Sequence, residues 1–190
     1  MKMISTLTLS NIFIEIKKSS KIAIPLIFAQ VIFDLNAFFT TAMIAKLSNV
    51  ELAAYGLMWD IYLMFIAFFT GLFSSTSILI SHSFGAKNYS NIGVSFHQGL
   101  YLAVFSTPIL MLIMWLCPIV LSKTKQDPTV IKLITPAFHA LSWIILPRNL
   151  TTIIRYLFIG TNRAHLVTLM GIIIVPIQIF FTHVFLLGKF

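Results

Sequence analysis

The chain has 190 residues, of which 58% are hydrophobic and only 9% are charged, and its mean hydropathy is +0.97. Soluble domains carry about 25% charged residues, so this composition excludes a soluble globular protein and indicates a polytopic membrane protein. The net charge of +8 does not indicate nucleic-acid binding. The basic residues lie at the ends of apolar runs, where they set membrane orientation, instead of clustering on one polar face. The single cysteine, Cys117, excludes an internal disulfide and a cysteine-based metal cluster.

The order of polar and apolar stretches predicts how the chain is organised. Residues 1–20 mix apolar and polar side chains and are expected to form an interfacial N-terminal segment. Residues 21–190 hold about five apolar runs, each long enough for the roughly 20-residue helix that crosses a bilayer. Because the runs are continuous and do not alternate, they predict helices and not barrel strands. The expected fold is therefore an all-α membrane protein with transmembrane helices near 22–45, 52–81, 94–121, 129–159 and 166–187.

The connections between the runs predict the orientation of the chain. The N-terminus and the connections 82–93 and 160–165 fall on one side of the membrane, and this side holds more Lys and Arg than the other. Cytoplasmic segments carry such an excess, so we expect the N-terminus in the cytoplasm and the C-terminus outside. The sequence stops at Phe190, directly after an apolar run, and we therefore expect an incomplete lobe.

The first run carries a carboxylate, Asp34, near its middle. A carboxylate at the bilayer centre costs about 2.5–3.5 kcal/mol on insertion scales. Asp34 is therefore a candidate site for a proton or a cation, facing a cavity. Gln30 lies one turn earlier on the same helix face, whereas Asn36 lies about 200° around the helix from Asp34. The alternative is a buried polar cluster that holds helices together.

Arg148 lies well inside the fourth run. A pair with Asp34 or with Asp60 would offset the cost of burying both charges, and an arginine that extends to the membrane surface is the alternative. Asp60 itself has aromatic neighbours and is expected near the outer surface. His139 and His183 are expected to form hydrogen bonds between helices. No Cys/His cluster, no Ser/His/Asp spacing and no glycine-rich phosphate loop is present in the sequence, so nothing in it indicates an enzyme or a bound cofactor.

Several short motifs occur in a characteristic order along residues 21–190. The most specific is Phe-Gly-Ala-Lys-Asn, within residues 83–88, and Arg155 followed by Gly160 comes later. In this order and spacing the sequence resembles the N-terminal part of the multidrug and toxic compound extrusion (MATE) family. The motifs are Pro25-Leu26 with Gln30, Leu52-Ala-Ala-Tyr-Gly56, Gly71-Leu72, Ser83-Phe-Gly-Ala-Lys-Asn88 and His97-Gln-Gly99.

The resemblance implies a secondary antiporter that exports cationic or amphipathic drugs in exchange for H⁺ or Na⁺. Its fold has about twelve helices in two similar lobes around a central cavity, as in other repeat-built transporters. This chain would supply about five helices of the first lobe. It would lie in the bacterial inner membrane, with lipids and small drugs as partners, no nucleic acid, and a second copy or a second-lobe chain to complete it.

The resemblance also assigns candidate roles on the first helix. The family usually carries an aspartate at the place of Thr40, and Asn36 lies one turn earlier on the same face. We therefore expect ion coupling to involve Asp34, Asn36 and Thr40. The substrate cavity is expected to include Gln30, Asp34, Asn36 and Arg148. Either Asp34 has taken over the coupling role, or coupling in this lobe is lost.

Two other functions remain open at the level of the sequence. The chain would be a truncated remnant without transport activity if the early stop and the replacement at Thr40 reflect lost function. It would be a flippase-like relative that moves lipid-linked sugars if its cavity were lined with basic residues. Arg148 is the clearest basic candidate for such a lining. The flippase hypothesis is therefore the weakest of the three.

Overall fold

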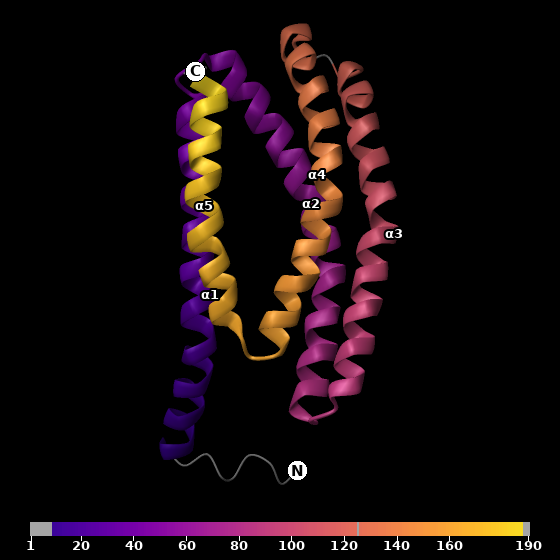
Figure 1. The fold of residues 1–190 in the computed structure, drawn as a ribbon. Coiled ribbons are helices and arrows are strands. Elements are labelled where there is room, and N and C mark those ends of the chain that lie inside the picture. Colours follow the sequence, from indigo (N-terminus) through magenta and orange to yellow (C-terminus); the bar gives the residue numbers. More distant parts are fainter. Residues whose placement is uncertain (1–8, 125, 188–190) are drawn as a thin grey trace.

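A computed structural model of the chain describes residues 9–124 and 126–187, and within these ranges it contains helices and no strands. The helices follow one another through short connections (Figure 1). Each contains a stretch long and apolar enough to cross a membrane. The expected all-α fold with five spans is therefore confirmed. The helices are α1 (Leu9–Ile44), α2 (Asn49–Gly85), α3 (Tyr89–Ser122), α4 (Pro128–Gly160) and α5 (Ala164–Leu187).

Polar residues between the apolar runs start three of the helices. Ser48, Asn88 and Asp127 precede α2, α3 and α4, and each side chain accepts a hydrogen bond from a backbone N–H in the first turn of its helix. Such caps satisfy donors that would otherwise have no partner at a helix start. The short polar connections of the sequence therefore fix where these spans begin.

The first helix is longer than the apolar run that predicts it. α1 continues without a break from Leu9 to Ile44, and its apolar span covers Leu26–Ile44. Residues 9–20 of the expected interfacial segment are thus continuous with the first span. Residues 1–8 of that segment lie outside the described residues.

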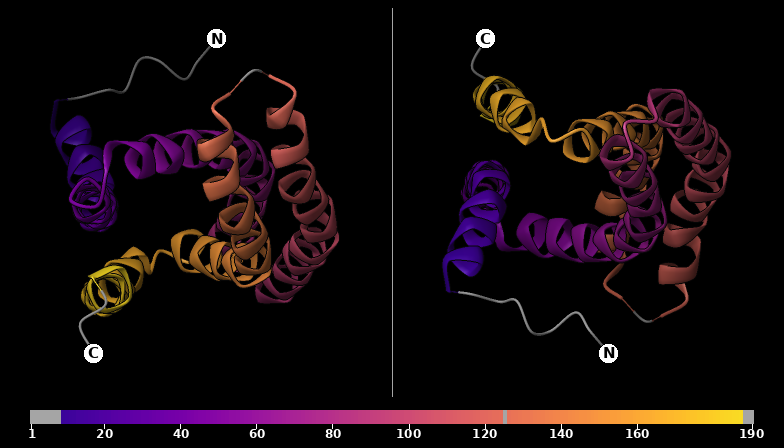
Figure 2. Two further views of the ribbon diagram at one scale, coloured as in Figure 1. Left: turned by 90° about the horizontal axis from the view of Figure 1, so that it is seen from above. Right: turned by 90° about the horizontal axis from the view of Figure 1, so that it is seen from below.

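The helices form two groups (Figures 1 and 2). α1 packs along α5, and α2, α3 and α4 pack against one another. Contact between the α1–α5 pair and the α2–α3–α4 group is sparse. The chain alternates in direction, so that the start of α1 and the connections α2–α3 and α4–α5 lie at one end of the molecule (Figure 1). We call this end the N-terminal end.

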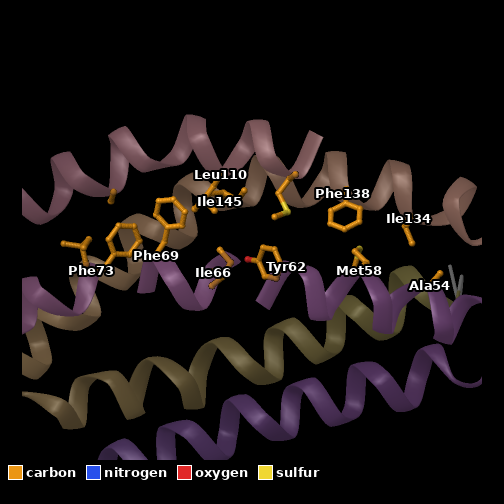
Figure 3. Packing of buried hydrophobic residues seen from close by; sticks show 13 residues of the cluster. Ala54, Met58, Tyr62, Ile66, Phe69, Phe73, Leu110, Ile134, Phe138 and Ile145 are labelled. Carbon is orange, nitrogen blue, oxygen red and sulfur yellow. The ribbon is translucent and has the colours of Figure 1, made fainter. Parts of the chain in front are cut away.

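The hydrophobic core lies inside the α2–α3–α4 group (Figure 3). Its α2 residues recur every three or four positions, from Ala54 through Tyr62 to Phe73, which places them on one helix face. Phe138 and Ile145 of α4 are completely buried against this face. α4 packs tightly on α2 at Gly160, where an added Cβ would lie 2.6 Å from Ile80 Cγ2.

Candidate functional site

Asp34 lies about 12 Å into the apolar span of α1, counted at 1.5 Å per residue from Leu26. The Gln30 side-chain amide donates a hydrogen bond of 2.9 Å to Asp34 Oδ1, which confirms that the two residues share a face. Both side chains are exposed.

The other two candidate coupling residues lie elsewhere on α1. Asn36 and Thr40 are half-buried, and Asn36 Oδ1 is buried with no hydrogen-bond partner in the part of the chain that the structure describes. The candidate residues of α1 therefore divide between an exposed face, with Gln30 and Asp34, and a more buried face, with Asn36 and Thr40. A buried acceptor without a donor is costly.

Arg148 of α4 does not pair with a carboxylate among residues 9–124 and 126–187. Its Cζ atom lies 5.7 Å from the ring centroid of Tyr62 on α2, in cation–π geometry. Asp34 and Asp60 are both exposed, and neither is among the groups that interact electrostatically with Arg148. Of the two alternatives for Arg148, the ion pair is therefore not formed within the described residues, because Arg148 contacts Tyr62 at the α2–α4 interface.

Arg155, which the sequence analysis treated only as a family marker, faces the other group of helices. Its Cζ atom lies 5.7 Å from the ring centroid of Phe33 on α1. It is half-buried, and its Nε atom is buried with no hydrogen-bond partner in the described structure. Arg148 and Arg155 are seven residues apart and therefore lie near the same side of α4. This seven-residue spacing could have indicated from the sequence that the two arginines lie near each other.

Polar side chains also connect α3 and α4. Asn149 Nδ2 donates to Thr107 Oγ1 over 3.1 Å, and Trp115 Nε1 donates to Ser142 Oγ over 2.8 Å. The His139 ring was expected to form a hydrogen bond between helices. Instead it stacks on Trp115 with 4.8 Å between ring centroids. These contacts hold α3 against α4, and within the described residues Asn149 Oδ1 is buried without a hydrogen-bond partner.

A cavity of about 200 Å³ lies near the α1–α2 connection. Residues from the end of α1, the α1–α2 connection, α2 and α4 line it, and Glu51 is its charged residue. None of the candidate site residues lines this cavity. In the described residues, no group of three or more His, Cys, Asp or Glu side chains could hold a metal ion.

Residues 25–184 match the family model described as MatE. The chain belongs to the MatE family. This match confirms the resemblance to the MATE family, in its N-terminal part, that the ordered motifs indicated. Together with five helices able to cross a membrane, it shows that the chain is a multi-pass membrane protein of a transporter family.

Relatives of this MatE chain carry multidrug resistance names. The chain is 26% identical over 171 residues to a "Probable multidrug resistance protein NorM" of Streptococcus pneumoniae, which covers 90% of the chain and 38% of the relative. It is 27% identical over 170 residues to a "Probable multidrug resistance protein NorM" of Listeria monocytogenes, which covers 87% of the chain and 37% of the relative. It is 27% identical over 132 residues to "Multidrug resistance protein MdtK" of Klebsiella pneumoniae, which covers 69% of the chain and 29% of the relative. The chain thus spans less than two fifths of the length of these relatives. No solved structure matches it significantly.

Proposed function

We propose that this chain forms part of a MatE-type secondary transporter that exports small cationic or amphipathic drugs in exchange for protons or sodium ions. The family match and the multidrug resistance names of its relatives support this function. The observation that carries the coupling step is Asp34, an exposed carboxylate within the apolar span of α1 that accepts a hydrogen bond from Gln30. A charge at this depth persists only where water, a cation or a proton offsets its cost.

In the proposed cycle, Asp34 binds either the coupling ion or the cationic drug. Gln30 donates to one carboxylate oxygen and holds the side chain in position, while the other oxygen takes the proton or the cation. Protonation removes the negative charge and with it the attraction for a cationic drug, so the two ligands compete. Thr40 stands where the family usually places its acid, and Asp34 acts in this scheme as a displaced substitute.

A transport cycle of this type alternates between two lobes around a central site. The chain spans only 38% of the length of its NorM relative. We therefore propose that further helices, from a second copy of the chain or from a second lobe, complete the cavity. We place the assembly in the bacterial inner membrane, with the N-terminal end of the molecule in the cytoplasm.

The test is efflux by bacterial cells that lack their own multidrug exporters and express this chain. We expect lower accumulation of a cationic dye than in cells with an empty vector, and loss of that difference in Asp34→Asn. Asp60→Asn is the matched control, since Asp60 is also an exposed carboxylate within a span, and it should leave efflux unchanged. A stable, membrane-inserted chain that exports no dye would overturn autonomous transport and favour the inactive remnant.

A further inference from the structure

Arg148 and Arg155 form an arginine pair on α4 whose charge no carboxylate balances in the described part of the chain. The groups that interact electrostatically with Arg148 are Tyr62, Arg155 and Tyr156. Arg155 contacts the ring of Phe33. Two guanidinium groups thus lie within electrostatic reach of each other among aromatic rings. Like charges repel strongly in such an environment, so the pair is incomplete without an anion.

A hydrogen bond links the α4 backbone beside Arg155 to α2. Tyr156, next to Arg155, donates a hydrogen bond of 3.3 Å to the backbone carbonyl of Thr70 on α2. Thr152, between the two arginines, donates to the backbone carbonyl of Arg148 within α4. Arg155 Nε is buried and has no hydrogen-bond partner among the described residues, so the protein leaves this donor unsatisfied.

The depth of the pair in the membrane points to a lipid. α4 has 33 residues, or about 50 Å at 1.5 Å per residue, against about 30 Å of hydrocarbon. If α4 is centred, about 10 Å of it extends beyond the hydrocarbon at each end. Arg155 lies about 7 Å from Gly160 at the end of α4, and Arg148 lies about 18 Å from it. Arg155 is thus at headgroup depth, and Arg148 lies about 8 Å inside the hydrocarbon, where a charge needs a partner.

We propose that the arginine pair binds the phosphate group of an anionic lipid from the leaflet at the N-terminal end of the molecule. Guanidinium groups bind phosphate through paired hydrogen bonds. The rings of Phe33, Tyr62 and Tyr156 beside the pair suit the glycerol and acyl portions better than they suit a fully hydrated ion. This anionic site is separate from Asp34 and does not depend on the proposed drug transport.

The test is ligand binding by the purified full chain in a neutral detergent, followed by native mass spectrometry. The probes are phosphatidylglycerol, phosphatidylcholine and inorganic phosphate. We expect phosphatidylglycerol to bind at least tenfold more tightly than phosphatidylcholine, and Arg148→Gln/Arg155→Gln to abolish this preference. Millimolar inorganic phosphate should not displace the lipid. Displacement by inorganic phosphate at equal affinity would overturn the assignment to a lipid.

Two further variants separate the site from general charge effects and from misfolding. Arg163→Gln removes the same charge from an exposed residue in the α4–α5 connection at the same end of the molecule, and it should keep the preference. Arg148→Lys/Arg155→Lys keeps the charge but not the planar fork, and it should weaken phosphatidylglycerol binding severalfold even if the glutamine variant does not fold. An equal loss in Arg163→Gln, or full binding by the lysine variant, would overturn the proposal.

Discussion

The side-chain amide of Asn149 on α4 donates a 3.1 Å hydrogen bond to Thr107 Oγ1 on α3. Both residues are buried, and Asn149 is completely so. The Thr107 hydroxyl in turn donates to the backbone carbonyl of Ala103 in its own helix. A polar chain of this kind inside an apolar interface fixes the rotation and the register of α3 against α4, which apolar contacts alone specify weakly.

Removing this hydrogen bond should weaken the contact between α3 and α4 measurably. Asn149→Ala and Thr107→Val should each lower stability, and a double-mutant cycle should give a coupling of about 0.6 kcal/mol, with an upper range near 1.7 kcal/mol. The measurement is reversible unfolding of the purified chain in mixed micelles. Strictly additive single effects would show that the hydrogen bond does not contribute to stability.

Gly160 should not tolerate a methyl group. A Cβ at this position would lie 2.6 Å from Ile80 Cγ2 and 3.1 Å from the Ser77 carbonyl oxygen, so Gly160→Ala should destabilise the chain by about 1–3 kcal/mol through overpacking. Gly71→Ala is the control, because a Cβ there has no neighbour within 4 Å. The fraction that remains monodisperse after heating in detergent reports the difference. Equal losses in both variants would contradict the expected clash.

Lys87 is held in a left-handed backbone conformation, with φ of 56°. It lies in the α2–α3 turn, within the motif Phe84-Gly-Ala-Lys-Asn88. Because a β-branched residue is strained in this conformation, Lys87→Val should cost about 1–2 kcal/mol and Lys87→Gly should cost little. Thermal unfolding of the two variants compares them directly. A tolerated valine would mean that the turn relaxes to another conformation.

The proposed orientation can be tested with single cysteines. Since Cys117 is the only cysteine of the chain, Cys117→Ala gives a background without thiols. Arg163→Cys and Lys46→Cys introduce exposed thiols at opposite ends of the molecule. A membrane-impermeant maleimide added to intact cells should label Lys46→Cys and should reach Arg163→Cys only after lysis. The reverse pattern would place the N-terminal end outside.

The number and the approximate extents of the spans could be predicted because length and apolarity are properties of each run taken separately. The starts of α2, α3 and α4 lie up to five residues earlier than the expected 52, 94 and 129. The reason is that Ser48, Asn88 and Asp127 cap these helices, so polar residues of the connections belong to the first turns. The pairing of α1 with α5 could not be predicted. Lipid-facing and helix-facing surfaces are equally apolar, so hydropathy along the chain does not distinguish them.

The candidate site was only partly predictable for the same reason. The neighbours Gln30 and Asp34 were predictable because they are four residues apart on one helix. The environment of Arg148 depends on a residue 86 positions away in the sequence, Tyr62, and a charge in the sequence does not show whether it faces a carboxylate or a ring. Arg155 was overlooked because its position near the end of a span is typical of a flanking charge.

The packing of α1 against α5 has a consequence for biosynthesis. A ribosome adds about 5–20 residues per second, so α5 leaves it on the order of 10 s after α1. During that interval α2, α3 and α4 can insert into the membrane and pack on one another, because they are neighbours in the sequence. α1 is already in the membrane but does not yet contact α5. The first helix to be made is therefore the last to dock.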